Sequence, residues 1–365
     1  MKVELIDLKK RYLDEKEDLL SCFDRVLKNG SLVLTNEVNN FEDNICKYTN
    51  SKFCLGLNSG TDALMMALWS LGISKGDEVI TSPLSFVASV GSIVHVGAKP
   101  VFVDVKNDLN INEDLIESAI TKKTKAIMPV HWSGKICNMD KILEIANKYD
   151  IKVIEDSAQG MGSYYKKKHA GTFGEISAFS AHPLKNLNAV GDAGFVVTDN
   201  EELYKSIKLY RTHGMESRDN VKIFGINSRL DSLNAEILSY RLTRLEEIIE
   251  KRRKNISLYK KYIKTNKVIL PQDSPNGYDS YVMMISLCEE RDKLQSFLET
   301  KGIQSLVYYG TPLHLHKASS ILGYNEGDLM NAEKLSKKVL SFPHHQYLKE
   351  DEIKYVSDSI NQFYE

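Results

Sequence analysis

Short apolar runs alternate with amphipathic segments through the first two thirds of the chain. The runs are rich in strand-favouring residues, and each is followed by a stretch in which apolar residues recur at helical spacing. This pattern predicts strands over 53–57, 79–81, 101–105, 126–130 and 153–155, and helices over 62–71, 86–96 and 139–149. Strands that alternate with helices favour a largely parallel sheet covered on both faces. Ligands bind such sheets where strands end and loops enter helices.

The pattern changes after about residue 230. Residues 233–264 are charged, have a helical period and lack Pro and Gly, which predicts one long helix between two domains or along a subunit interface. A strand-like run over 281–287, a helix over 291–301 and a last helix from Lys349 follow. We therefore predict an α/β protein with a large domain over residues 1–245 and a small α+β domain over residues 246–365.

Composition and charge exclude several functional classes. The 365 residues include 48 Lys and Arg against 49 Asp and Glu, so the net charge of -1 gives no general attraction to nucleic acid. No stretch of about 18 apolar residues predicts a membrane span, and the N-terminus lacks the apolar run of a signal peptide. The five cysteines include no Cys-x-x-Cys pair, which disfavours disulfides and a zinc site and indicates a reducing cytoplasm. We predict no metal.

One loop has the character of an anion site. Asn58, Ser59, Gly60 and Thr61 separate the end of a predicted strand from an apolar helix. Free backbone N–H groups and the helix dipole attract an anion at such a helix start, and glycine lets the backbone approach the ligand closely. The alternative is a simple helix cap formed by Ser59 or Thr61.

Two further loops carry an acid and a lysine. Asp156 follows an apolar strand, where its carboxylate could keep a ligand's pyridine nitrogen protonated or could simply cap a helix. Lys185 follows a second such run, with Pro183 before it and glycines beyond. An imine-forming lysine needs a lowered pKa and a fixed position, whereas an isolated lysine is usually a solvated surface charge.

These loops, in this order, resemble the DegT/StrS family of sugar aminotransferases, which are fold-type I pyridoxal-phosphate enzymes. The resemblance rests on Asn-Ser-Gly-Thr-Asp-Ala-Leu at 58–64, Glu-Asp-Ser-Ala-Gln at 155–159, Ser-Ala-His-Pro-Leu-Lys-Asn-Leu at 180–187 and Gly-Asp-Ala-Gly at 191–194. It extends from Ile6 to Pro343 and so spans nearly the whole chain. It implies a large domain with a mostly parallel sheet flanked by helices, and a smaller α+β domain.

The resemblance implies a role for each residue of a cofactor site. Lys185 would hold pyridoxal 5'-phosphate as an imine and shuttle the proton, and pyridoxamine phosphate would form in the half-reaction. Asp156 would pair with the pyridinium nitrogen and Gln159 with the ring hydroxyl oxygen. The remaining cofactor-binding residues would be Gly60, Thr61 and Ser180 at the phosphate and Phe86 stacked on the ring. The alternative for Phe86 is a core phenylalanine.

Five more positions carry open alternatives. Asn227 matches a residue that reaches the phosphate from a neighbouring subunit. In that case the functional unit would be a homodimer with a shared active site. The alternative is that Asn227 caps the following helix. His182 could line the substrate pocket, tune the lysine or form structural hydrogen bonds. Tyr308, Tyr309 and His314 lie in a loop where the resemblance implies substrate-facing residues, although Tyr-Tyr-Gly-Thr-Pro-Leu-His stands here where a Tyr-Pro-x-Pro run is common.

The implied reaction is transamination from L-glutamate to a keto-sugar linked to a nucleotide, in amino-sugar biosynthesis of the kind that supplies surface polysaccharide or lipopolysaccharide. The stretch at 227–231 resembles members that act at C3, whereas His182-Pro183 resembles members that act at C4; we favour C3 slightly. A free or phosphorylated keto-sugar or keto-cyclitol is an alternative substrate, and a non-catalytic regulatory protein is an alternative function. A nicotinamide oxidoreductase is disfavoured because no Gly-x-Gly-x-x-Gly follows the first strand.

Overall fold

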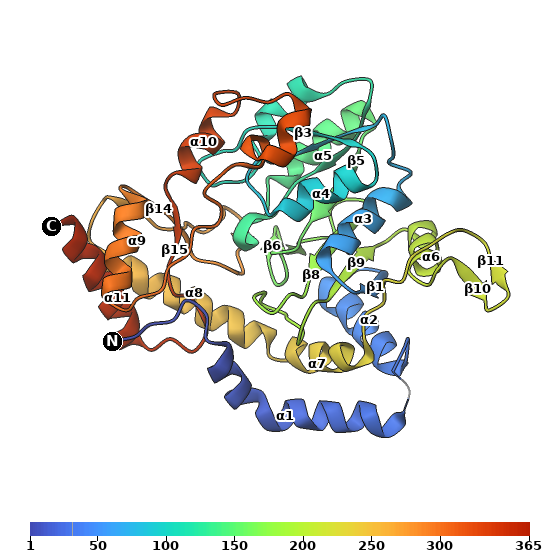
Figure 1. The fold of residues 1–365 in the computed structure, drawn as a ribbon, viewed down its shortest axis with the longest axis horizontal. Coiled ribbons are helices and arrows are strands. Elements are labelled where there is room, and N and C mark those ends of the chain that lie inside the picture. The colour runs from blue at the N-terminus through green and yellow to red at the C-terminus, as the bar shows by residue number, and fades with distance from the viewer. Residues whose placement is uncertain (31) are drawn as a thin grey trace.

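The computed structural model describes residues 1–30 and 32–365. A seven-stranded sheet with the order β1-β9-β8-β5-β4-β2-β3 forms the centre of the large domain (Figure 1). Its pairs are parallel except those of β9, which runs antiparallel to β1 and to β8. The strands are β1 (Phe53–Leu57), β2 (Glu78–Thr81), β3 (Lys99–Phe102), β4 (Thr124–Met128), β5 (Lys152–Asp156), β8 (Ile176–Ser180) and β9 (Gly194–Thr198).

Successive residues of a strand point to opposite faces of the sheet, and helices pack on both faces of this one. On β1, Leu55 packs into the hydrophobic cluster of α3 and α6, whereas Cys54 packs into the cluster of α2 and α7 on the other face. The predicted α/β fold class is therefore confirmed. The helices of the large domain are α1 (Leu8–Asn29), α2 (Asn36–Thr49), α3 (Gly60–Ser70), α4 (Val87–His95), α5 (Met139–Tyr149), α6 (Glu201–Tyr210) and α7 (Ser232–Leu242).

The predicted long helix over 233–264 is wrong. The segment forms two helices, α7 and α8 (Leu245–Tyr262), separated at Thr243 and Arg244. The Thr243 hydroxyl donates a hydrogen bond to the Tyr240 carbonyl at 2.7 Å, and Arg244 extends to the Asp14 carboxylate at 2.9 Å. Helix α7 thus ends on local and tertiary hydrogen bonds that hydrophobic periodicity does not reveal.

Two other predicted segments are shorter in the structure or placed differently. Residues 101–105 were expected to form a strand, but β3 ends at Phe102. The run over 281–287 contributes only β14 (Ile285–Cys288), because Val282 instead donates its N–H to the Ser133 carbonyl at 3.1 Å. This contact joins the segment that precedes β14 in the small domain to a loop of the large domain.

The small domain has its own hydrophobic core. A three-stranded sheet of order β12-β14-β15 packs with helices, and Val3 at the beginning of the chain joins the same cluster. Helix α8 contributes Ile249 to a core of the large domain and Ile256 to the core of the small one, so the division at 245/246 stays a prediction. The elements are β12 (Val268–Ile269), β14, β15 (Val339–Ser341), α9 (Arg291–Thr300), α10 (Met330–Ser336) and α11 (Glu350–Tyr364).

The remaining strands form two small sheets outside the main one. Strands β10 (Met215–Ser217) and β11 (Asn220–Val221) make a hairpin that projects at the right of Figure 1. A second sheet contains β13 (Gly277–Tyr278), β6 (Tyr164–Tyr165) and β7 (Lys168–His169). None of the helices described in residues 1–30 and 32–365 is long and apolar enough to cross a membrane.

Candidate active site

The carboxyl ends of the parallel strands meet at one edge of the sheet, and the predicted site residues gather there. Asp156 is the last residue of β5, and Ser180 is the last residue of β8. Gly60 begins α3 just beyond β1. Because β9 runs antiparallel, it contributes its first residue, Gly194, to the same edge.

Lys185 lies in the loop between β8 and β9. Its backbone N–H donates to the His182 carbonyl at 2.9 Å, which holds the loop in a turn. Burial lowers the pKa of the Lys185 amine to about 8, and the Asp156 carboxylate opposes that shift. An amine with such a pKa is neutral, and therefore nucleophilic, in about a tenth of molecules at pH 7, far more often than an ordinary lysine amine.

The Asp156 carboxylate is buried and held by few donors. The Ser89 hydroxyl on α4 donates to Oδ2 at 2.6 Å, and the backbone N–H of Ala158 donates to Oδ1 at 3.2 Å. Burial raises the pKa of Asp156, while Ser89, Ala158 and the charge of Lys185 act against this rise. A buried carboxylate with capacity for another partner can pair with a cationic group of a ligand.

An anion cradle forms where β1 meets α3. The Ser59 hydroxyl accepts the Asp62 N–H at 3.1 Å, so Ser59 caps the helix as the alternative reading proposed. The cap and the anion site are compatible, because capping satisfies only part of the N–H groups at a helix start. A Cβ added to Gly60 would lie 2.7 Å from the Ser180 Cβ, and one added to Gly194 would lie 2.5 Å from the Gly60 nitrogen. Both glycines therefore let the two loops approach closely.

Gln159 is buried and fixed by the loop after β4. Its Oε1 accepts the backbone N–H of Ser133 at 2.5 Å. The Ser133 hydroxyl in turn donates to the Met283 carbonyl at 2.5 Å, which links Gln159 to the small domain. Ser133 was not predicted from the sequence. In the structure its backbone has a positive φ of 55°.

Aromatic side chains form one wall of the site. Phe86 is 53% exposed, so it is not the core residue of the alternative reading. Its ring centroid lies 6.0 Å from that of Tyr309, which in turn lies 5.6 Å from Trp132. Burial raises the pKa of Tyr309, and the negative charge of the Asp156 carboxylate adds to this rise. Tyr309 lies in the loop in which substrate-facing residues were expected, whereas Trp132 was not among the predicted site residues.

The substrate candidates occupy different surroundings. His182 is exposed; burial and the neighbouring Lys185 lower its pKa, and its Nδ1 accepts the Leu184 N–H at 3.3 Å. His314 is buried, with Nε2 3.0 Å from the Glu333 carboxylate and its ring packed near Phe102. These contacts favour a structural role for His314.

Tyr308 and Asn227 also lie outside the Lys185–Asp156 cluster. Tyr308 lines a small cavity at the junction of the domains. Asn227 is exposed and lines a hollow of about 230 Å³ together with Asn58, which precedes the anion cradle. It does not cap α7, because that helix begins at Ser232 with Asp231 in the cap position.

The residues at this edge fit a pyridoxal-phosphate cofactor. A buried amine of lowered pKa, a buried carboxylate and a helix start prepared for an anion match its aldehyde, its pyridine nitrogen and its phosphate. In residues 1–30 and 32–365, no three His, Cys, Asp or Glu side chains are arranged to hold a metal ion. Fold and site together define a fold-type I pyridoxal-phosphate enzyme.

Comparisons with known proteins identify the family. Residues 13–361 match the model of the DegT/DnrJ/EryC1/StrS aminotransferase family, and the chain belongs to that family. It is 38% identical to a pleiotropic regulatory protein of Geobacillus stearothermophilus, over 100% of this chain and 99% of that protein. It is 35% identical to the UDP-2-acetamido-2-deoxy-3-oxo-D-glucuronate aminotransferase of Pseudomonas aeruginosa, over 97% of this chain and 98% of the relative.

A solved structure agrees over the same length. The S. venezuelae protein DesV, in complex with a ketimine intermediate, matches with a TM-score of 0.97 and 33% identity, covering 100% of this chain and 99% of that one. The chain is therefore a pyridoxal-phosphate-dependent sugar aminotransferase, and the predicted family, enzyme class and cofactor are confirmed. The roles of the individual site residues stay predictions.

Proposed function

We propose that the enzyme transfers an amino group from L-glutamate to C3 of a nucleotide-linked keto-sugar, and that it does so as a homodimer with a shared active site. The observation that carries the chemistry is the placement of the buried Asp156 carboxylate at the end of β5 and of the buried Lys185 amine in the loop after β8, at the same edge of the sheet as the anion cradle. When bound, the cofactor supplies an electron sink. Lys185 is then the group that moves the proton between the reacting carbons, and Asp156 holds a positive charge on the ring nitrogen.

The choice of C3 rests on two observations. The Pseudomonas relative is named for a UDP-linked sugar with a keto group at position 3. The stretch Asn227 to Asp231 resembles the C3-acting members of the family. The donor, L-glutamate, is expected because the family resemblance implies it. Surface polysaccharide or lipopolysaccharide is the expected destination of the aminated sugar.

A half-reaction screen tests the substrate. The enzyme is loaded as its pyridoxamine-phosphate form and mixed with freshly prepared UDP- and dTDP-linked 3-keto and 4-keto sugars, and the return of the imine absorbance is followed. We expect a 3-keto sugar nucleotide to restore the band. A response to 4-keto sugars alone would overturn the C3 assignment, and a response to the free keto-sugar or keto-cyclitol without nucleotide would favour that alternative.

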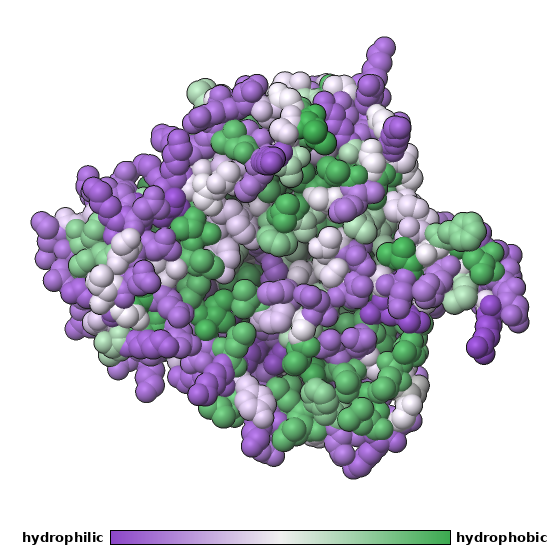
Figure 2. All heavy atoms as spheres, viewed as in Figure 1, coloured by the Kyte–Doolittle hydropathy of each residue, from purple (hydrophilic) through white to green (hydrophobic). Residues whose placement is uncertain are grey.

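The dimer is supported by an apolar face on α1. Leu13, Leu20 and Leu27 are spaced seven residues apart and are 63%, 50% and 55% exposed, whereas the opposite face of α1 packs on α7. Figure 2 shows hydrophobic residues gathered over this lower part of the molecule, where Figure 1 places α1. Single exposed leucines are ordinary, but a contiguous apolar face indicates a protein partner.

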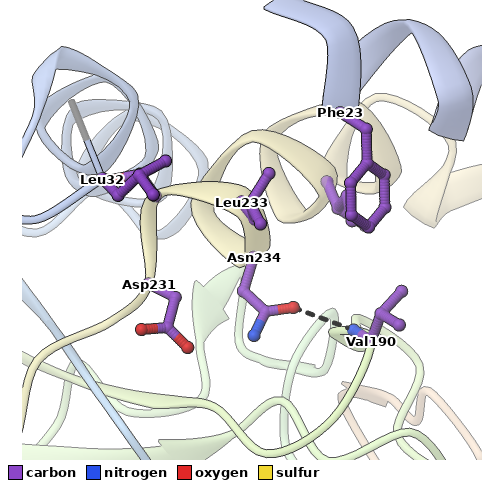
Figure 3. Close-up of a pocket in the computed structure, with 8 residues that line it drawn as sticks. Phe23, Leu32, Val190, Asp231, Leu233 and Asn234 are labelled. Carbon is purple, nitrogen blue, oxygen red and sulfur yellow. Dashed lines mark hydrogen bonds between the residues drawn. The ribbon is translucent and has the colours of Figure 1, made fainter. Parts of the chain in front are cut away.

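A pocket continues this apolar face. It has a volume of about 280 Å³ and lies between α1 and the start of α7, lined by side chains that include Phe23, Leu32 and Val190 (Figure 3). Asn234 closes its floor by accepting the Val190 N–H at 3.0 Å. Because Val190 belongs to the loop that carries Lys185, a second copy seated here would lie close to the active site.

Two measurements test the shared site. Leu20→Glu should convert the dimer to a monomer in light scattering, while Lys354→Glu at an exposed position of α11 should not. Mixing inactive Lys185→Ala dimers with inactive Asn227→Asp dimers should restore a fraction of the activity, since one kind of site in the mixed dimer is intact. Absence of recovery, with subunit exchange demonstrated, would show that Asn227 does not act across subunits.

The regulatory name of the Geobacillus relative favours one second candidate, a regulatory role. The intact Lys185, Asp156 and Gln159 argue against a protein without turnover. Deleting the gene and restoring it with a Lys185→Ala allele separates the two functions. Rescue of the phenotype by the inactive allele would support regulation. We also expect the enzyme to act in the cytoplasm, because its five cysteines are free thiols.

A further inference from the structure

A buried arginine without an acidic partner lies at the junction of the two domains. Arg252, on α8, is 4% exposed. Its Nη1 donates to the Val282 carbonyl at 2.8 Å, but its buried Nε has no hydrogen-bond partner. Among the residues that the structure describes, no carboxylate oxygen lies within 4.0 Å of its guanidinium nitrogens. A buried charge of this kind is costly unless a counter-charge compensates it.

The surroundings of Arg252 make the local charge more positive. The positive charge of Arg11 contributes to lowering the pKa of Arg252. The Nη2 of Arg11 is also buried and has no hydrogen-bond partner. Arg11 does contact Glu15, but that carboxylate is shared with Arg241, whose Nη2 lies 2.7 Å from it. Burial and Arg11 together lower the pKa of Arg252 to about 9. The cluster is therefore short of negative charge.

A small cavity adjoins this arginine. It has a volume of about 20 Å³ and is lined by Arg252, Tyr308, His344 and His345, with Ile6 and Met283 as apolar walls. The volume exceeds that needed for one water molecule and suits a small ion rather than a metabolite. Both histidines are buried, whereas the cavity as a whole is partly open to solvent.

The histidines present hydrogen-bonding groups to this space. His344 Nε2 donates to the Tyr281 carbonyl at 3.0 Å, which leaves Nδ1 buried and without a partner. His345 accepts the Tyr347 N–H at Nδ1, so in its neutral form the proton is on Nε2. Burial and the charge of Arg252 hold the pKa of His344 well below its usual range, so the ring is neutral and its Nδ1 can accept a hydrogen bond from water. A bound anion would offset the charge of Arg252 and favour the protonated ring, in which Nδ1 donates.

We propose that Arg252, His344, His345 and Tyr308 form a binding site for one small monovalent anion of the halide class, located at the junction of the two domains. The anion supplies the negative charge that Arg252 lacks and accepts hydrogen bonds from the guanidinium and from the Tyr308 hydroxyl. The site is separate from the Lys185–Asp156 cluster and does not take part in transamination.

The site is nevertheless connected to the cofactor-binding edge. Arg252 bonds the Val282 carbonyl, and the Val282 N–H donates to the Ser133 carbonyl. The Ser133 N–H then donates to Gln159. An anion that fixes Arg252 therefore helps to hold the loop that positions Gln159, and it stabilises the contact between the domains.

Thermal unfolding of the holoenzyme tests the proposal at constant ionic strength. Sodium gluconate, whose anion is too large for the cavity, is replaced stepwise by sodium chloride or bromide. We expect a saturable rise in Tm of about 2 °C in both halides. Arg252→Met should abolish the rise, whereas Lys254→Met, an exposed position on the same helix, should keep it. If Arg252→Met does not fold, His345→Phe serves instead and should reduce the response.

Crystals grown in bromide give an independent readout, because an anomalous peak between Arg252 and the histidines would locate the ion. A cavity that contains only water, or a Tm that is equal in gluconate and halide, would overturn the proposal. So would an equal halide response in wild type and Arg252→Met, since that would be a general salt effect. Bromide density without a saturable Tm response would mean binding at crystal concentration only. None of these readouts depends on the sugar substrate.

Discussion

Glu155 and Asp156 are adjacent in the chain, but they lie on opposite sides of the sheet, and the pKa values of their carboxylates shift in opposite directions. Both carboxylates are buried, so burial alone raises the pKa of each. The net pKa shifts nevertheless differ in sign: the pKa of Glu155 is lowered and that of Asp156 is raised. Successive residues of β5 point to opposite faces, which separates the two environments.

The supply of hydrogen-bond donors explains the difference. The Glu155 carboxylate accepts from His131 Nε2 at 2.9 Å and from the backbone N–H groups of Gly171, Phe173 and Gly174 at 2.8, 2.6 and 2.8 Å. Among the residues that the structure describes, only Ser89 and Ala158 donate hydrogen bonds to the Asp156 carboxylate. A carboxylate saturated by donors is a structural clamp, whereas one with few donors is available to a ligand cation. We therefore expect Asp156 to contribute to the reaction and Glu155 to contribute to the stability of the fold.

The largest effect is expected at Lys185, whose pKa the Asp156 carboxylate influences. Lys185→Ala should lower kcat by at least about 10⁴-fold, because both the nucleophile and the proton-transfer group are lost. The imine absorbance should disappear, while the Tm of the apoenzyme should change little. Lys205→Ala, an exposed lysine on α6, is the matched control. Normal turnover by Lys185→Ala would refute the assignment of the site.

Removing the charge of Glu155 should affect stability instead of turnover. Glu155→Gln places an amide N–H₂ group against backbone donors and should lower the free energy of unfolding by about 3–5 kcal/mol. Activity per folded molecule should stay near the wild-type value. Denaturant unfolding measures the first quantity and active-site titration the second. Glu175→Gln is the control, since that partly exposed carboxylate accepts the Val153 N–H and should lose far less.

The pH dependence of stability follows from the sign of the Glu155 pKa shift. Its pKa in the folded state lies below the ordinary value of 4.5, so the unfolded state binds more protons in the interval between them. The stabilisation is complete above the unfolded pKa and is lost as the pH falls through the folded one. Glu155→Gln should therefore show a shallower loss of stability below about pH 4.5. An equally steep acid transition in the variant would contradict the clamp.

Asp156→Asn tests the other side of the comparison. An uncharged amide cannot hold a proton on the ring nitrogen, so kcat should fall by about 10²–10³-fold while the cofactor still binds. Steady-state kinetics and cofactor titration separate the two effects. Kinetics unchanged from wild type would remove Asp156 from the site.

Local sequence patterns predicted the parts of the molecule that local interactions determine. Helix α5 spans Met139–Tyr149 as expected, because Asn138 caps its start at Lys141 and Asp150 ends it with a positive φ. The motif loops likewise lie together at one edge of the sheet. Ser89 was missed because its partner Asp156 is 67 residues away, and Ser133 because it reaches Met283 across 150 residues. Such contacts depend on how the strands are ordered in the sheet and how the two domains pack, which no single loop encodes.

The smallest effect is expected from removing one of the hydrogen-bond donors to the Asp156 carboxylate, the Ser89 hydroxyl. Ser89 donates to Asp156 Oδ2 and is itself 2.6 Å from the Ser85 hydroxyl, so Ser85 donates to Ser89. Ser89→Ala should raise the pKa of Asp156, because a hydrogen bond to the charged form is lost. The acidic limb of the kcat profile should then move to higher pH, and kcat at its maximum should fall several-fold, corresponding to about 1 kcal/mol.

Ser92→Ala is the control for this prediction, because Ser92 lies on the same helix as Ser89 and is also buried. The Ser92 hydroxyl, however, donates to the Ser89 carbonyl at 3.0 Å and not to Asp156. A merely structural effect of removing a buried hydroxyl from α4 would change both variants alike. A displaced pH profile in Ser89→Ala alone would show that the donors around Asp156 set its protonation. A shift toward lower pH would mean that scarcity of donors is not what distinguishes Asp156 from Glu155.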